Sequence, residues 1–352
     1  GFSLFGEEIW VIRLTQVFLY AILIIVNYLF VLTSFNNKKI AFYSSLFMVF
    51  PTVNTVLYTT VTLGGYVESL LLGILSFYIS TIIIKKINNG NCQLMCLVGA
   101  QGFILGAGLF INPLSLTLVL PAIINAVFHI LSARLDKSVI IRLIGIFFLF
   151  FFIGSSFFWY ALLFSKGASV LQELSGSAVA VENQTYFNEA LSHLVSFLLF
   201  GLTVILGIRR PWSVELFAVW IIPFVLSFWL LVFYYFTKQK ITLRIELSII
   251  LSLTGVFLLV IGGFIFTSFG VDPSGRYFLP LMIPLSVFAG YAIEKFKKFF
   301  LSFLAIIVLT YQIYGTWNSS IREPFITTQF YSPAQVDHSN IEKLKEFLIN
   351  EN

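Results

Sequence analysis

The sequence predicts an all-α fold, a polytopic transmembrane helical bundle of about ten spans with an external interfacial loop and a short polar C-terminal tail. Of its 352 residues, 59% are hydrophobic and 11% are charged, and the mean hydropathy is +0.95. A soluble protein of this size would have too little polar surface to cover itself, so the bilayer must be its main solvent. The charges also lie almost entirely between apolar blocks, as expected for loops that connect spans.

The apolar blocks have the length that a membrane requires. A helix needs about 20 apolar residues to cross about 30 Å of hydrocarbon. We therefore expect spans at 10–32, 40–57, 66–84, 92–111, 114–131, 139–162, 214–236, 247–266, 277–293 and 299–314. A further apolar stretch, 195–208, is too short to cross straight and precedes Pro211. We expect 164–213 to be one external segment whose apolar part lies in the membrane surface, or dips in and returns.

Lys and Arg predict the orientation of the bundle. They cluster at 38–39, 85–86, 134–137, 238–244 and 295–298, in short loops that the positive-inside tendency places in the cytoplasm. The net charge of +5 then reflects orientation, and we expect no binding to nucleic acid. The domains expected are a membrane domain at 1–314 and an external tail at 315–352. The protein is expected to be a multi-pass protein of the cell (plasma) membrane, in contact with membrane lipids.

The most distinctive segment is FGVDPSGRYFLPLMIP, at 269–284. Asp272 belongs to a turn by composition, and this turn places Arg276 and Tyr277 at the outer mouth of the next span. An Arg there could bind a phosphate bidentately, which the desolvated edge of the bilayer would strengthen. An interfacial Arg and Tyr that merely anchor a helix end would look the same, and both interpretations stay open.

The segment LGGYVESLLLG, at 63–73, carries an acidic residue just inside an apolar helix. Glu68 lies two residues beyond Tyr66, where an ionised group costs a few kcal/mol unless it is paired or hydrated. It could accept a proton, hold an acceptor hydroxyl or pair with Arg276. The alternative is an N-terminal Glu that the helix dipole favours.

A third segment, GAGLFINPLSL at 106–116, turns between two spans at Asn112. We expect Asn112, Tyr66 and Asp272 to line the same external cavity, although the Asn-Pro pair is also explained by turn formation alone. The histidines are scattered along the chain and predict neither a zinc site nor a catalytic triad. No cofactor is indicated, and a requirement for a divalent metal stays open.

Four segments in order, FGEEIWVIRL, GGYVESLLLG, GLFINPLSL and DPSGRYFLPL, resemble the successive signatures of the C-type (GT-C) membrane glycosyltransferases. The nearest subset is the bacterial and archaeal proteins related to the protein mannosyltransferase and lipid A aminoarabinose transferase families. The resemblance covers 1–314.

This resemblance implies inverting transfer of a sugar from a polyprenyl-phosphate donor to a lipid, glycan or protein acceptor at the outer membrane face. In these families a carboxylate activates the acceptor hydroxyl, and basic residues bind the carrier phosphate. By matched motif, Glu68 falls on an acidic or polar position at the cavity, and Arg276 and Tyr277 fall on the pair near the phosphate. Their principal acidic residue lies in the first external loop, so we expect this chain to be an N-terminally truncated fragment that lacks it.

Two other classes of protein compete with the enzyme. A transporter or flippase of lipid-linked sugars would use the same Arg and Glu for binding, with polar residues near the midplane of several spans. A structural membrane subunit would use Glu68 and Arg276 as a buried ion pair. We favour the enzyme because the polar positions gather at one face.

Overall fold

The computed structural model describes residues 9–60, 65–87, 91–133, 135–164, 189–211, 213–238, 244–267, 269, 275–296 and 299–322. These residues form helices and no named strand, which confirms the predicted all-α fold. Nine helices within them are long and apolar enough to cross a membrane, and a bent helix pair raises the count to 10 if it is one span. The chain is therefore a multi-pass membrane protein.

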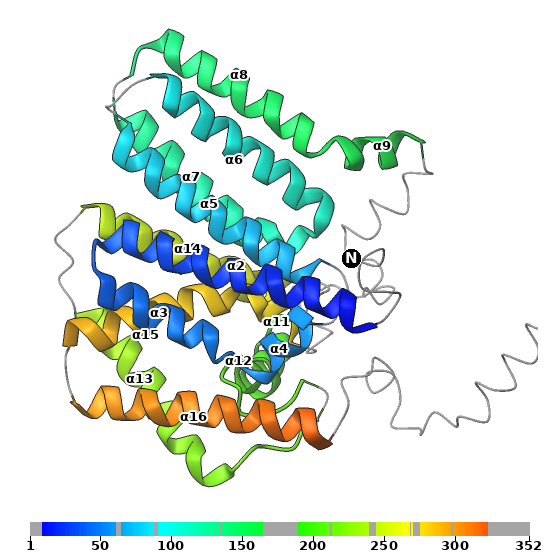
Figure 1. Ribbon diagram of the computed structural model, residues 1–352, viewed down its shortest axis with the longest axis vertical. Helices are drawn as coiled ribbons and strands as arrows, with labels where there is room; N and C mark the ends of the chain where they lie inside the picture. The colour runs from blue at the N-terminus through cyan, green and yellow to red at the C-terminus, as the bar shows by residue number, and fades with distance from the viewer. Residues whose placement is uncertain are drawn as a thin grey trace, which may run out of the picture.

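Figure 1 shows most helices lying side by side in two groups. The upper group holds the helices from α5 to α9, and the lower group holds α2, α3 and those from α13 to α16. The bounds are α2 Ile9–Phe35, α3 Lys38–Val49, α4 Val53–Thr60, α5 Tyr66–Lys86, α6 Asn91–Ile111, α7 Leu116–Ser132, α8 Lys137–Gly154, α9 Ser156–Phe164, α13 Ile222–Lys238, α14 Arg244–Phe266, α15 Met282–Phe296 and α16 Phe299–Arg322. The groups join where α2 packs on α5 and α7 packs on α14.

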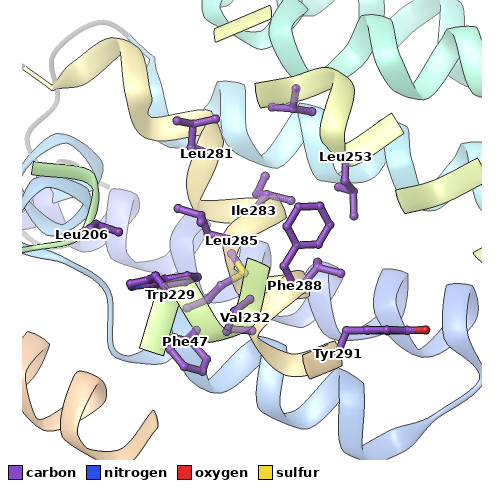
Figure 2. Close-up of a cluster of buried hydrophobic side chains, with 14 of the residues drawn as sticks. Phe47, Leu206, Trp229, Val232, Leu253, Leu281, Ile283, Leu285, Phe288 and Tyr291 are labelled. Carbon is purple, nitrogen blue, oxygen red and sulfur yellow. The ribbon is translucent and has the colours of Figure 1, made fainter. Parts of the chain in front are cut away.

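Helix α15 lies at the centre of the lower group. All its residues from Ile283 to Ile293 are buried, and Gly290 lets α3 approach so closely that a Cβ there would lie 2.6 Å from the Ser44 nitrogen. Figure 2 shows Phe288 and Leu285 of α15 gathered with Phe47 of α3 and Trp229 of α13. This core fixes the helices that carry the candidate site.

One predicted span is broken in the structure. The block 40–57 was expected to be continuous, but α3 and α4 meet at 74° around Pro51. Proline lacks the N–H that a continuing helix needs and disfavours helical geometry at Phe50, so the helix stops there. The predicted span 139–162 is likewise divided, because α8 ends at Gly154 and α9 begins at Ser156.

The short apolar stretch forms α11 (Ala190–Ser196), the π-helical turn η2 (Phe197–Gly201) and α12 (Leu202–Ile205). The ring of His193 hydrogen-bonds through Nδ1 to the carbonyl oxygen of Ile265, at 2.9 Å, near the end of α14. At the other end, a Cβ on Gly275 would lie 2.6 Å from Val204 Cγ1. Both ends of the stretch thus contact the same end of the bundle, consistent with a segment that does not cross. The preceding residues, 165–188, lie outside the described residues.

Arg209 stabilises the turn that follows α12. Its guanidinium donates hydrogen bonds to the carbonyl oxygens of Arg210, Ser213 and Phe200, at 2.9, 2.9 and 3.0 Å. Burial lowers the pKa of Arg209 from its ordinary value. Its role is therefore to hold the chain ahead of α13.

The last helix is longer than predicted. Helix α16 continues past residue 314 to Arg322, into the region expected to be the external tail. The remainder of that tail, 323–352, lies outside the described residues.

Candidate functional site

Glu68 lies in the first turn of α5, whose N-cap is Gly65. Gly65 adopts φ 67°, and a Cβ there would lie 2.8 Å from Ile111 Cγ2, so the start of α5 packs closely on the end of α6. One carboxylate oxygen of Glu68, Oε1, accepts a hydrogen bond from Gln16 Nε2 of α2 at 2.9 Å. The other oxygen, Oε2, is buried and has no hydrogen-bond partner among the described residues. The carboxylate is thus oriented by one contact and keeps a free acceptor.

Asn112 follows α6 directly and acts as a helix cap. Its Oδ1 accepts a hydrogen bond at 2.9 Å from the Leu114 nitrogen, in the 3₁₀ turn η1 (Pro113–Ser115). This contact is the turn-forming role that the Asn-Pro pair predicts. Asn112 is half-buried, next to the Ile111 that contacts Gly65.

Arg276 and Tyr277 begin the 3₁₀ helix η5 (Arg276–Leu281), which leads into α15. The preceding Gly275 has φ 85°, and its carbonyl oxygen accepts a hydrogen bond from Asn54 Nδ2 of α4 at 3.1 Å. The Arg276 guanidinium lies 4.9 Å from the centre of the Tyr277 ring, and that ring packs on Phe269, 4.9 Å between centroids. The predicted cavity residue Asp272 lies outside the described residues.

The structure brings the elements that carry these residues together. Helix η5 contacts α4, α5 and η1, and η1 contacts the ends of α5 and α6. The turn before Arg276 and the bend before Glu68 therefore lie at the same end of the bundle. Tyr66 also belongs to this end, where its ring packs edge-on against Tyr58 of α4, 5.4 Å between centroids.

Glu68 and Arg276 do not form an ion pair with each other. Among the described residues, the one contact of this kind joins His193 and Glu189, with 3.8 Å between the nitrogen and oxygen atoms, and it is an ion pair only when His193 is protonated. Within the same residues, no group of three His, Cys, Asp or Glu side chains is placed to hold a metal ion.

Beside η5 lies a small cavity of about 40 Å³, where the break between α3 and α4 meets α13, α15 and α16. Phe278 and Leu279 of η5 contribute to its wall, and its polar lining residues are Thr52, Asn54, Thr55, Trp229, Ser286 and Gln312. None of Glu68, Tyr66, Asn112, Arg276 and Tyr277 lines it. That those residues line an outward-facing cavity of their own stays a prediction.

Two neighbours of the site were not predicted from the sequence. Gln16 orients Glu68, and Asn54 holds the turn before Arg276. The sequence feature that could have indicated them is a polar side chain inside an apolar block, because Gln16 and Asn54 each lie among mostly hydrophobic residues. The pairing itself joins segments far apart in the sequence, so it could not be predicted from spacing.

No known protein family matches the chain, and neither a curated protein nor a solved structure matches it. The site is therefore interpreted from its own residues.

Proposed function

We propose that the protein is a membrane glycosyltransferase that moves a sugar from a polyprenyl-phosphate donor to an acceptor hydroxyl at the outer membrane face. The observation that carries the proposal is the convergence of three polar segments at one end of the bundle, with η5 in contact with α5 and η1. The ordered resemblance of four segments to GT-C enzymes supports the same function. The acceptor class is a lipid, a glycan or a protein.

In this proposal Arg276 binds the donor phosphate. A guanidinium presents two parallel N–H donors to phosphate oxygens, and low water content near the bilayer strengthens the contact. Tyr277 supports the guanidinium through the face of its ring, and Asn54 fixes the backbone just before it. The charge is thus placed where the head group of a membrane-borne donor arrives.

Glu68 is the candidate acid–base residue among the described residues. Its unpaired Oε2 can accept the proton of the acceptor hydroxyl, while the hydroxyl oxygen forms a bond to the anomeric carbon of the sugar. The bond from that carbon to the phosphate oxygen breaks, and the polyprenyl phosphate leaves with the electron pair. Attack opposite the leaving group inverts the anomeric centre.

The decisive experiment replaces Arg276 in the full chain and measures sugar transfer from a polyprenyl-phosphate donor. We expect Arg276→Ala to abolish transfer. Arg276→Lys should keep a fraction of the activity, because its ammonium retains the positive charge but lacks the two parallel N–H donors of the guanidinium. Arg142→Ala, an exposed cation on α8, is the matched control and should leave transfer unchanged. Undiminished turnover in folded, inserted Arg276→Ala would remove Arg276 from the phosphate role.

A transporter of lipid-linked sugars is the second candidate. It is favoured by buried polar residues inside predicted spans, where Asn27 Nδ2 donates to Ser44 Oγ, 3.1 Å away. A short-chain donor in detergent separates the two functions, since an enzyme transfers its sugar without a bilayer and a transporter does not.

A further inference from the structure

Three residues that line the cavity beside η5 each carry a buried polar atom without a hydrogen-bond partner among the described residues. Trp229 Nε1, Gln312 Oε1 and Asn54 Oδ1 each have none among the described residues, although all three side chains line the cavity. These side chains are only 6%, 5% and 2% exposed. Leaving such a group unsatisfied costs about 1–3 kcal/mol, so three such residues around one cavity favour the binding of a polar group there.

The unpaired atoms define the chemistry of that occupant. An indole N–H only donates a hydrogen bond, while the two amide oxygens only accept one. A hydroxyl group or a water molecule does both, because its oxygen accepts from the indole and its proton is donated to an amide. An aliphatic group or a simple ether would leave the amide oxygens unsatisfied.

The lining also indicates that the occupant is uncharged. Among the described residues, no Asp, Glu, Lys, Arg or His lines the cavity, and the polar side chains that line it are amides, hydroxyls and one indole. An ion would therefore enter a buried site with no charged partner, which is strongly unfavourable.

The size of the cavity and its aromatic wall fit a small hydroxylated group. About 40 Å³ is room for about two or three water molecules, or for a group of similar size. Phe47 and Trp229 both line the cavity, and their rings meet edge-on with 6.1 Å between centroids. Figure 2 shows these two side chains next to each other. Aromatic faces of this kind cover the C–H edges of a polyol while the polar atoms bind its hydroxyls.

The cavity continues into a buried hydrogen-bonded chain. Ser286 lines the cavity and accepts a hydrogen bond from Ser44 at 3.4 Å, and Ser44 accepts one from Asn27 at 3.1 Å. These three side chains are at most 3% exposed. The site is thus the end of a polar path between α2, α3 and α15, and not an isolated packing defect.

We propose that this cavity is a binding site for an uncharged, hydroxyl-bearing molecule, held by Trp229, Gln312 and Asn54. Water and the hydroxyls of a small polyol or sugar share this chemistry. The proposal does not depend on the proposed transferase activity, because it rests on the lining of the cavity alone.

Hydroxyl-radical labelling of the protein in lipid nanodiscs, read by mass spectrometry, tests whether the cavity is occupied by water. Phe278 lines the cavity and Phe264 does not, yet both are buried, at 2% and 1% exposure. We expect Phe278 to be labelled at least about fivefold faster, because a bound water generates the radical beside its ring. Equal labelling of the two rings would show a dry cavity and overturn the proposal.

Trp229→Phe and Gln312→Leu test whether the polar atoms hold the occupant. Gln312→Leu removes the amide with little change in volume, whereas Trp229→Phe removes the indole N–H and also enlarges the cavity with apolar surface. Because apolar cavities stay dry, we expect the labelling of Phe278 to fall toward that of Phe264 in both variants. Unchanged labelling in both folded variants would also overturn the proposal.

The unfolding temperature with increasing glycerol or methyl glucoside distinguishes the two sources of the hydroxyl. A saturable rise that Trp229→Phe loses identifies a solute hydroxyl as the ligand. A linear rise alone, shared by both proteins, together with fast labelling of Phe278, identifies water.

Discussion

Gln16 on α2 donates a hydrogen bond to one carboxylate oxygen of Glu68 on α5, with 2.9 Å between Nε2 and Oε1. The other carboxylate oxygen is buried and unpaired among the described residues. This contact joins the first described helix to the first turn of α5. It leaves Glu68 oriented and still able to accept a proton.

Gln16→Leu should therefore slow sugar transfer more than it weakens substrate binding. A hydrogen bond to a charged group is worth about 1.5–3 kcal/mol, so we expect kcat to fall about tenfold or more. KM for the donor should change little, because in the proposed mechanism Arg276, and not Gln16, binds the phosphate. Steady-state kinetics with a polyprenyl-phosphate donor measure the two parameters separately.

The matched control for this prediction is Gln93→Leu. Gln93 is an exposed residue of α6 whose Oε1 accepts a hydrogen bond from Lys86 Nζ at 3.4 Å, at the other end of α5. The Gln93→Leu substitution should leave kcat unchanged. Gln16→Leu with wild-type kcat would show that the contact does not position Glu68 for catalysis.

Gly275→Ala should destabilise the turn before Arg276. Alanine would have to adopt φ 85°, and its Cβ would lie 2.6 Å from Val204 Cγ1 and 2.7 Å from Asn54 Oδ1. We expect the free energy of unfolding to fall by about 1–3 kcal/mol. Thermal unfolding in detergent measures the loss.

Gly262→Ala is the comparison for that substitution. A Cβ at Gly262 of α14 meets nothing within 4 Å, so alanine should keep or raise stability through its better helix propensity. Equal unfolding temperatures for the Gly275 and Gly262 variants would contradict the strain assigned to this turn.

The number and place of most helices could be predicted from the sequence, because the length of an apolar block and its flanking charges are local properties. The bend between α3 and α4 was missed although Pro51 was visible. A proline inside an apolar block can end a helix or be accommodated within it: α3 ends before Pro51, whereas α7 continues through Pro121. Tertiary packing decides between these outcomes.

The candidate site was predicted only in part for a related reason. A polar residue at the end of a span can be seen in the sequence, so Glu68, Asn112 and Arg276 could be proposed as candidates. Their partners could not be, because Gln16 and Asn54 are defined by contacts across 52 and 221 positions of the chain. Trp229 was missed for another reason, since tryptophan in a span is ordinary until its N–H is found buried and unpaired.

Gln101→Leu should weaken the pairing of α5 with α6. Ser76 Oγ donates to Gln101 Oε1 at 2.7 Å, and Gln101 Nε2 donates to the Ser76 carbonyl oxygen at 2.8 Å, both inside the bundle. Polar contacts between membrane helices average about 0.6 kcal/mol and reach about 1.7 kcal/mol. We expect a loss in that range, and a double-mutant cycle with Ser76→Ala measured by unfolding should show coupling. Additive losses would mean that the contact contributes packing only.

Gly106→Leu should separate α6 from α8. A Cβ at Gly106 would lie 2.2 Å from the Phe151 carbonyl oxygen, and one at Gly154 would lie 2.4 Å from that of Phe103, so the two backbones touch. Small residues permit this close approach. In lipid, the packing that results supplies much of the attraction between helices, because burial from water does not drive helices together there.

Gly145→Leu is the control on α8 itself. A Cβ at Gly145 meets nothing within 4 Å, so this substitution should be tolerated. The distance between spin labels attached one to α6 and one to α8 should increase in the Gly106 variant and not in the Gly145 variant. Asn112 follows α6, but no candidate site residue lies within α6 or α8. Loss of the pairing should therefore lower stability before it lowers transfer.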